Sequence, residues 1–193
     1  MRLFSAGSLG LYFVALLLPC VFVRPGHAQE GLVNRENLIK AAYLANFLRY
    51  VDWPHEAEDA NRPPMIAVVG RHPVVPYLQQ AAQQSDETLF QVVVVDGETV
   101  SREYRILFLP GSLDPDLRRK LLRSARNFPV LTVGENLEFL QEGGEVRFVI
   151  EDNKLRLELA LRAIESKKLK VSSKLLQVAR VLDAEPRVSK SSR

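Results

Sequence analysis

The sequence predicts one α/β domain, a mostly parallel, Rossmann-like three-layer sheet to which a C-terminal antiparallel hairpin is added. Four short apolar runs alternate with segments of helical periodicity, at residues 65–70, 90–96, 105–110 and 129–134. Such alternation is typical of a parallel sheet covered by helices. After residue 144 the chain alternates apolar and polar residues, which predicts a hairpin. We expect the domain at residues 29–186, a length that suits one core.

The first 28 residues have the features of a cleaved secretory signal. Arg2 precedes a nearly continuous apolar run at residues 9–23, which is shorter than the about 20 residues that a membrane span needs. Small residues occupy positions −3 and −1 of a cleavage site after Ala28. We therefore expect residues 1–28 to be removed and Gln29 to begin an exported chain.

The mature chain would be nearly neutral and free of thiols. Cys20, the only cysteine, lies in the signal, so disulfides, a cysteine nucleophile and thiolate metal sites are excluded. Cys20 leaves open a lipoprotein signal, which Pro19 disfavours, and an uncleaved anchor is a further alternative. Loss of Arg2 and Arg24 leaves 24 basic against 23 acidic residues, a balance that does not favour nucleic acid.

A helical wheel predicts an amphipathic first helix from about Arg35 to Trp53. Pro54 ends it, because proline disfavours the α-helical region for the residue before it. The heavy, aromatic-rich half, which we expect to pack on the sheet, consists of Ile39, Tyr43, Leu44, Phe47, Leu48, Tyr50 and Val51. The light half consists of Ala41, Ala42, Ala45, Asn46, Arg49 and Asp52.

Turn and cap residues mark the helices that separate the strands. A helix over residues 73–83 follows the first strand, with proline tolerated in its first turn. Asp114 and Pro115 have the pattern of an N-cap and a first helical residue. Asn136 is expected to cap a short helix over residues 137–142, which a glycine pair ends.

The C-terminal part is predicted to change from alternating strands to helix. In order, we expect a hairpin with one apolar face, a helical turn and a short edge strand, at residues 146–159, 160–166 and 169–171. Ser172 or Ser173 then caps a last helix that ends by Pro186. Residues 187–193 are expected to be a disordered tail.

The strand ends are where a ligand would bind. In sheets of this kind, ligands lie outside the carboxyl ends of the strands, and the candidate ligand-binding residues there are Arg71, Ser112 and Asn136. With backbone amides at helix N-termini they suit a phosphate or a carboxylate. The alternative is that these residues only make turns and caps. Neither glycine-rich nucleotide-binding fingerprint is present.

The sequence gives almost no support for catalysis. His55 and His72 lie beside prolines in predicted loops and at no metal-ligand spacing. Glu135, Glu138 and Glu142 are spaced along the predicted short helix, which is typical of a solvated face. We therefore predict no enzymatic activity, no metal and no cofactor.

Two segments resemble the YfiR family of small periplasmic proteins. The first is Lys-Ala-Ala-Tyr-Leu-x-x-Phe-x-x-Tyr-Val-x-Trp-Pro at residues 40–54. The second is Leu-x-Val-Ser-Ser-x-Leu-Leu-x-x-Ala at residues 169–179. The strand motifs between them follow in the family's order, so the resemblance covers residues 36–182.

The resemblance implies a regulator and not a catalyst. The best-known members repress an inner-membrane diguanylate cyclase by binding its periplasmic portion, which keeps cyclic di-GMP low and holds back exopolysaccharide and biofilm formation. An outer-membrane lipoprotein with a peptidoglycan-binding domain can sequester the repressor, and members are typically homodimers. We therefore expect a periplasmic repressor. The alternative is a periplasmic sensory module that binds an anion or a nucleotide at the strand ends.

The candidate residues for contact with the partner protein lie at the end of the first helix and near the hairpin, and are Trp53, Pro54, Glu158, Lys170 and Ser172. An exposed aromatic is a typical contact hot spot. The alternatives are that Trp53 plugs the core and that Glu158 and Lys170 lie on a solvated strand face.

The chain also departs from the family pattern. Typical members carry cysteines that form disulfides, so redox control does not transfer to this chain. Relatives often have Asn near Glu158 and Met where this chain has Glu145.

Overall fold

The structure is a computed structural model that describes residues 26–54, 62–83 and 90–182, and of residues 26–33 only the backbone. The predicted tail at residues 187–193 and nearly all of the predicted signal lie outside the described residues. The prediction of signal cleavage is therefore not addressed by the structure.

Seven strands form one sheet in the order β3-β2-β4-β5-β6-β7-β9. Neighbouring strands are parallel except for β6 and β7, which form the antiparallel hairpin. The strands are β2 (Met65–Val69), β3 (Gln91–Val95), β4 (Tyr104–Leu109), β5 (Leu131–Gly134), β6 (Val146–Glu151), β7 (Lys154–Leu159) and β9 (Ala179–Val181). The predicted fold, a mostly parallel sheet with an added hairpin, is confirmed.

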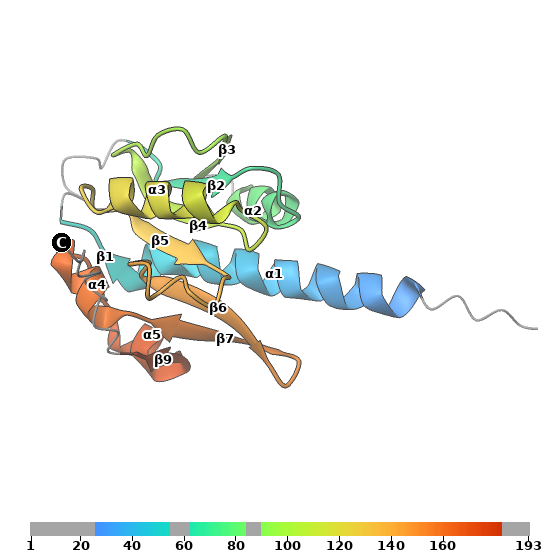
Figure 1. The fold of residues 1–193 in the computed structure, drawn as a ribbon. Helices are drawn as coiled ribbons and strands as arrows, with labels where there is room; N and C mark the ends of the chain where they lie inside the picture. The colour runs from blue at the N-terminus through green and yellow to red at the C-terminus, as the bar shows by residue number, and fades with distance from the viewer. Residues whose placement is uncertain (1–25, 55–61, 84–89, 183–193) are drawn as a thin grey trace, which may run out of the picture.

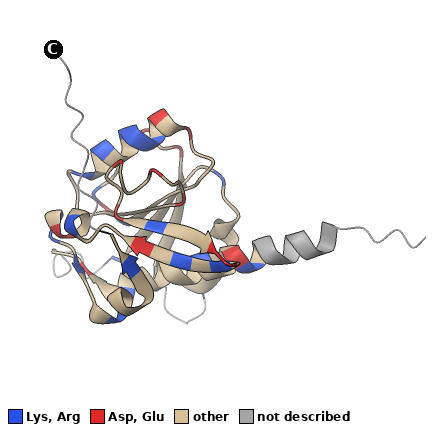
Figure 2. Cartoon of the chain, turned by 60° about the horizontal axis from the view of Figure 1, so that its bottom comes forward, with Lys and Arg blue, Asp and Glu red and all other residues tan. Residues whose placement is uncertain are grey.

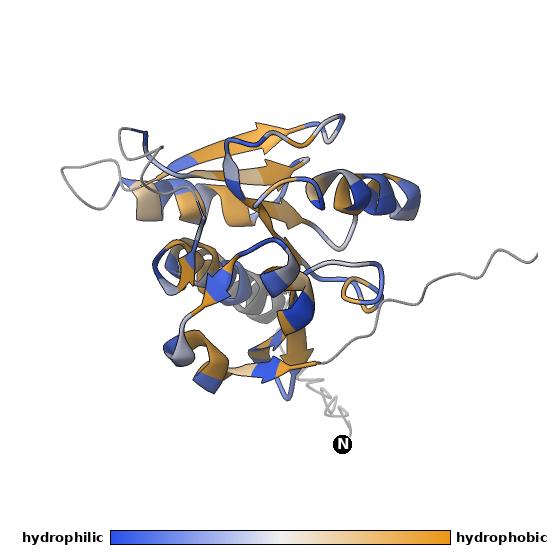
Figure 3. Cartoon of the chain, turned by 90° about the vertical axis from the view of Figure 1, so that its left-hand side faces the viewer, coloured by the Kyte–Doolittle hydropathy of each residue, from blue (hydrophilic) through white to orange (hydrophobic). Residues whose placement is uncertain are grey.

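Helices cover both faces of the sheet, as Figure 1 shows. α1 (Gly26–Tyr50) and α2 (Val74–Ala82) pack on one face, and α3 (Pro115–Ala125) packs on the other. Alternate strand residues enter the two cores, so that Val68 lies in the core with α1 and α2 and Val69 in the core with α3. β2, β4 and β5 are mostly hydrophobic along their length (Figure 3), because both faces of the sheet are covered there.

The helix α1 packs largely as its wheel predicts. Leu44 and Phe47 are fully buried, and the rings of Tyr43 and Phe47 lie 6.2 and 6.3 Å from the ring of Phe148 on β6. Ala41, which belongs to the predicted light half, is also buried. The buried stripe is therefore rotated from the predicted one toward the small residues, because α2 packs beside α1 as well.

The predicted end of the first helix at Trp53 is wrong. α1 ends at Tyr50, and the next two residues form β1 (Val51–Asp52), which pairs antiparallel with β8 (Lys170–Val171). The N–H of Ser172 donates to the carbonyl of Tyr50 at 2.8 Å, which extends this pairing to the helix end. A contact between segments far apart in the chain thus ends α1 before Pro54 does.

The last predicted helix is also shorter than expected. It is divided into α5 (Ser173–Val178) and the strand β9, which pairs parallel with β7. The helical turn predicted before it is confirmed as α4 (Leu161–Ser166). Asp152 and Asn153 make the hairpin turn with φ values of 50° and 57°, which is typical of a tight two-residue loop.

Two of the three predicted helix caps are confirmed. The side chain of Asp114 accepts hydrogen bonds from backbone N–H groups at the start of α3, and the side chain of Ser172 does the same for α5. The cap at Asn136 is wrong, because its side-chain amide donates to the carbonyl of Gly111 instead. Residues 137–143 form turns and not the predicted helix.

An ion pair ties α3 to these turns. Arg118 is buried, and its Nε and Nη2 donate to the two carboxylate oxygens of Glu142 at 2.7 and 3.0 Å. The hydrogen bond from Arg118 holds the pKa of Glu142 below its usual value. This paired arrangement replaces the solvated face that was predicted for Glu142.

We expect acid to weaken this link. Because the folded pKa of Glu142 is lowered, its stabilising effect is present above the unfolded pKa, about 4.3, and is lost as the pH falls through the folded value. Glu142→Gln should lower the free energy of unfolding at pH 7 by about 1–3 kcal/mol and flatten its decline in acid, measured by urea unfolding. Glu138→Gln, at an exposed position, is the control; an unchanged acid profile in Glu142→Gln would contradict this account.

Candidate functional site

The carboxyl ends of β2, β4 and β5 lie together at one end of the sheet, and the N-terminal half of α1 projects over this end (Figure 1). The predicted ligand-binding residues Arg71, Ser112 and Asn136 follow these three strands. Arg71 and Ser112 are exposed. The polar side chains that contact one another at this end of the sheet come instead from α1 and from Glu135.

The carboxylate of Glu135 is the centre of the strand-end site. Its Oε2 accepts a hydrogen bond from the backbone N–H of Gly111 at 2.6 Å, and its Oε1 accepts one from Nζ of Lys40 at 2.5 Å. Nε2 of His72 lies 3.9 Å from Oε2. One side chain thereby connects α1 with the segments that follow β2, β4 and β5.

The cation of this site is Lys40, which is only 7% exposed. It forms ion pairs with Glu135 and with Glu36, one turn earlier on α1. Burial alone would lower the pKa of Lys40, but the two carboxylates together outweigh burial and raise it. Lys40 is therefore charged and neutralised within the protein.

The imidazole of His72 belongs to the same cluster. Its Nδ1 accepts a hydrogen bond from the N–H of Val74 at 3.1 Å, which helps to start α2, and its ring meets Phe108 edge-on at 5.1 Å. Burial lowers the pKa of His72, against the opposing effect of Glu135. The neutral imidazole, with its proton on Nε2, fits these contacts. His72 therefore has a structural partner, and no metal-ligating group of three acidic, histidine or cysteine residues occurs among the described residues.

The strand-end site is thus occupied by the protein's own anion. The N–H of Gly111 is the kind of backbone donor that an external phosphate or carboxylate would use, and Glu135 already takes it. The nearby ammonium of Lys40 is neutralised as well. The alternative that the strand ends make only turns and internal contacts agrees with this geometry.

A second group of candidate residues lies at the opposite end of the molecule, around β1 and β8 (Figure 1). Asp52 and Lys170 are opposite each other in the strand pair, and both are exposed. Pro54 is exposed, whereas Trp53 is only 5% exposed and lies under the guanidinium of Arg105, 5.9 Å from its ring. The exposed aromatic expected here is therefore absent, and Trp53 belongs to the core.

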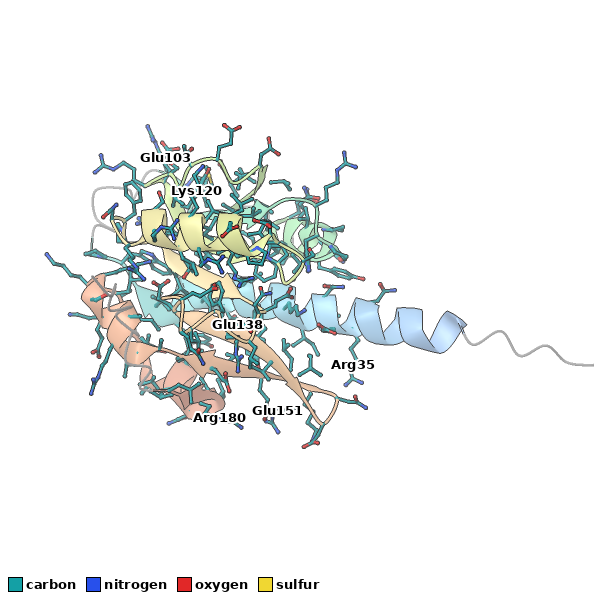
Figure 4. The ribbon with its side chains drawn as sticks, viewed as in Figure 1. Arg35, Glu103, Lys120, Glu138, Glu151 and Arg180 are labelled. Carbon is teal, nitrogen blue, oxygen red and sulfur yellow. The ribbon has the colours of Figure 1, made fainter. Side chains whose placement is uncertain are left out.

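Glu158 does not lie on a solvated face either. It is 4% exposed and pairs with Arg147 on β6 and with Arg180 on β9. Arg180 also donates to Glu151, the contact seen at the edge of the sheet in Figure 4. Figure 2 colours the acidic and basic residues of the chain, and the pairs of Glu158 and Glu151 with these arginines form a ladder that holds β9 to the hairpin.

Glu145, one of the residues at which the chain was expected to depart from the family pattern, is buried inside the fold. Its Oε1 lies 2.7 Å from Nζ of Lys167, and its Oε2 accepts a hydrogen bond from the N–H of Thr132 at 2.6 Å. Burial raises the pKa of Glu145, and Lys167 and Thr132 offset part of this effect. Glu145 therefore forms a buried ion pair and is not part of the outer surface.

These features describe a small α/β domain in which Lys40 and Glu135 pair with each other at the strand ends. A family model, DUF4154, described as YfiR/HmsC-like, matches residues 37–180. The chain belongs to the YfiR/HmsC-like family, and the resemblance noted from the sequence is confirmed. The family is one of regulators connected with cyclic di-GMP signalling and is not known for enzymes. No curated protein matches the chain.

In the part of the chain that the structure describes, no helix combines the length and the apolar character that a membrane crossing requires.

Removal of the Glu135 carboxylate should open the strand ends to an external anion. Glu135→Ala frees the N–H of Gly111 and removes one of the two carboxylates that pair with Lys40. Phosphate at ten times its dissociation constant would stabilise the variant by about 1.4 kcal/mol, so its melting temperature should rise by roughly 3–5 °C. The melting temperature of the unchanged protein should not respond, and sodium chloride at equal ionic strength is the control. An equal response of the unchanged protein would contradict the internal occupation of this site.

Proposed function

We propose that this protein is a periplasmic negative regulator that binds the periplasmic part of an inner-membrane diguanylate cyclase. Binding lowers cyclic di-GMP output and thereby limits exopolysaccharide and biofilm formation. The observation that carries the proposal is the family match over residues 37–180. In this proposal a cleaved signal exports the chain, the chain works as a homodimer, and an outer-membrane peptidoglycan-binding lipoprotein withdraws it from the cyclase.

The strand-end geometry supports a protein partner over a small-molecule ligand. A sensory module that binds an anion between the strand ends would use the innermost donors there, since Arg71 is exposed at the surface. The N–H of Gly111 and the ammonium of Lys40 are both paired with Glu135. The regulatory contacts are therefore sought on the outer surface of the domain.

The partner surface that we propose is the β1–β8 end, with Pro54, Lys170 and Ser172. The hydrogen bond from Ser172 to Tyr50 fixes the strand pair on the end of α1, and Lys170 is exposed beside it. Trp53 is buried next to Pro54, and the guanidinium of Arg105 lies over its ring. A contact surface that is held rigid loses little conformational freedom on binding.

Such binding regulates only if it distinguishes two states of the cyclase. A ligand shifts an equilibrium by its difference in affinity for the two states and by nothing else. To move equal populations to about 99% inactive, the regulator must bind the inactive arrangement about 100-fold more tightly, a difference of about 2.7 kcal/mol. A few well-placed contacts at the β1–β8 end suffice for a difference of this size.

Variants of Trp53 and Glu158 are poor tests of this surface. Both side chains are buried, and truncation of a buried tryptophan costs about 3–5 kcal/mol of stability. A loss of function would then report unfolding. Lys170 is exposed, so a change there leaves the core intact; because it lies opposite Asp52, thermal unfolding of each variant controls for the strand pair.

Deletion of the gene should raise cellular cyclic di-GMP, and the rise should disappear when the partner cyclase is also deleted. A Lys170→Glu copy should fail to restore the low level, because it reverses a charge on the proposed surface. Lys154→Glu, which reverses an exposed charge at the hairpin turn, should restore it. Immunoblots of the periplasmic fraction control for export. An unchanged cyclic di-GMP level on deletion, with the cyclase expressed and able to be activated, would contradict the proposal.

A further inference from the structure

The strand β3 forms an edge of the sheet, and the described residues give it none of the usual protections of an edge. Natural edge strands are commonly protected by charged residues, proline or a bulge, because an open edge pairs readily with another strand. β3 reads Gln-Val-Val-Val-Val and pairs with β2 in a regular register. Val94 is 50% exposed. The opposite edge strand, β9, carries Arg180 in its ladder of ion pairs.

The main-chain groups of β3 show which residues face the open edge. The N–H of Gln91 donates to Pro64, and the carbonyl of Val95 accepts from Gly70, both at 2.8 Å, so these two residues turn toward β2. Successive residues of a strand direct their main-chain groups to opposite edges. Val92 and Val94 therefore direct their N–H and C=O groups outward, away from β2.

The two segments at this edge carry no charged residue, and the first charge after β3 is the exposed Asp96. In a chain in which 25% of residues are charged, the twelve residues from Pro73 to Gln84 include no charged residue, and neither does the segment from Phe90 to Val95. α2, which comes from the first of these segments, lies against β3. By contrast, α3 carries Asp116 and a run of basic residues. Loss of charged residues is a feature of the centre of protein interfaces.

A neutral surface of this kind fits a second copy of the same chain. Around a two-fold axis, each residue meets the same or a nearby residue of the partner, so any charge near the axis would meet its own like charge. β3 and α2 contain no charged residue, so neither element brings like charges together at the axis. Strand pairing alone buries less than the roughly 1,200 Å² of a stable interface, and the uncharged exposed residues of α2, among them Gln79 and Gln80, add to it.

We propose that two copies of this chain associate through antiparallel pairing of β3 with β3, centred on Val93. This inference rests on the homodimer named in the proposed function and assigns its surface. In this register Val92 lies opposite Val94 of the partner subunit, and the two residues exchange both of their outward hydrogen bonds. Each exposed Val94 is covered by the partner's Val92. Val93 faces its own copy in the close, non-hydrogen-bonded position.

This register is tested by cysteine substitution in the exported protein. At a non-hydrogen-bonded position the two Cα atoms lie about 4.5 Å apart, within the disulfide range of about 4.4–6.8 Å. Val93→Cys should give a disulfide-linked dimer on a non-reducing gel under mild oxidation. Val94 lies opposite Val92 of the partner subunit and not opposite its own copy, so Val94→Cys should form far less of the linked dimer. The unchanged chain, whose only cysteine is Cys20, is the negative control for disulfide linking.

The surface itself is tested by sedimentation equilibrium. The unchanged protein should have twice the mass of one chain at micromolar concentration. Val94→Pro removes an outward N–H that β2 does not use, and Val94→Lys places a charge beside the axis, so each should halve the mass. Val178→Lys, at an exposed valine elsewhere, should leave the mass doubled, and circular dichroism should show that all variants are folded.

Three results would overturn the inference: a monomeric unchanged protein, both Val94 variants remaining dimeric, or equal linking at positions 93 and 94. None of these readouts measures cyclic di-GMP. A failure here would therefore leave the regulatory function standing, and a failure of that function would leave the dimer surface standing.

Discussion

The carboxylate of Glu135 holds together the end of the molecule where domains of this class usually bind ligands. It joins Lys40 of α1 to the backbone N–H of Gly111, and it lies beside His72 at the start of α2. In doing so it fixes α1 over the carboxyl ends of the strands. The same contact removes the donor that an external anion would use. The sheet has the architecture of a ligand-binding sheet, but Lys40 and Glu135 at its strand ends pair with each other.

Local signals predicted most of the fold. Asp114 with Pro115 identified the start of α3, and the alternation on both sides of Asp152 identified the hairpin, because cap and turn geometry depends on neighbouring residues. The ends of α1 and α5 could not be predicted in this way. Each helix stops where a strand pairing begins, β1 with β8 and β9 with β7, and these partners are distant in the sequence.

The sequence predicted where the strand-end site lies but not which side chains form it. Arg71, Ser112 and Asn136 follow the right strands, yet the groups that meet are Lys40 and Glu135, which are 95 residues apart. Lys40 is part of the family-like motif at residues 40–54, and its spacing of four from Glu36 was the one local sign of an acidic environment. A core position for Trp53 was one of two alternatives, and burial of Glu158 was not foreseen, because it depends on Arg147 and Arg180 from other strands.

Direct binding tests the central claim of this account, that the protein acts through a protein surface and not through a strand-end ligand. The purified protein would be titrated calorimetrically with the periplasmic part of each inner-membrane diguanylate cyclase of its own organism. We predict saturable binding to one of them, weakened by Lys170→Glu and unaffected by Glu135→Ala. Absence of binding to every cyclase, or binding that depends on Glu135 and not on Lys170, would contradict the account.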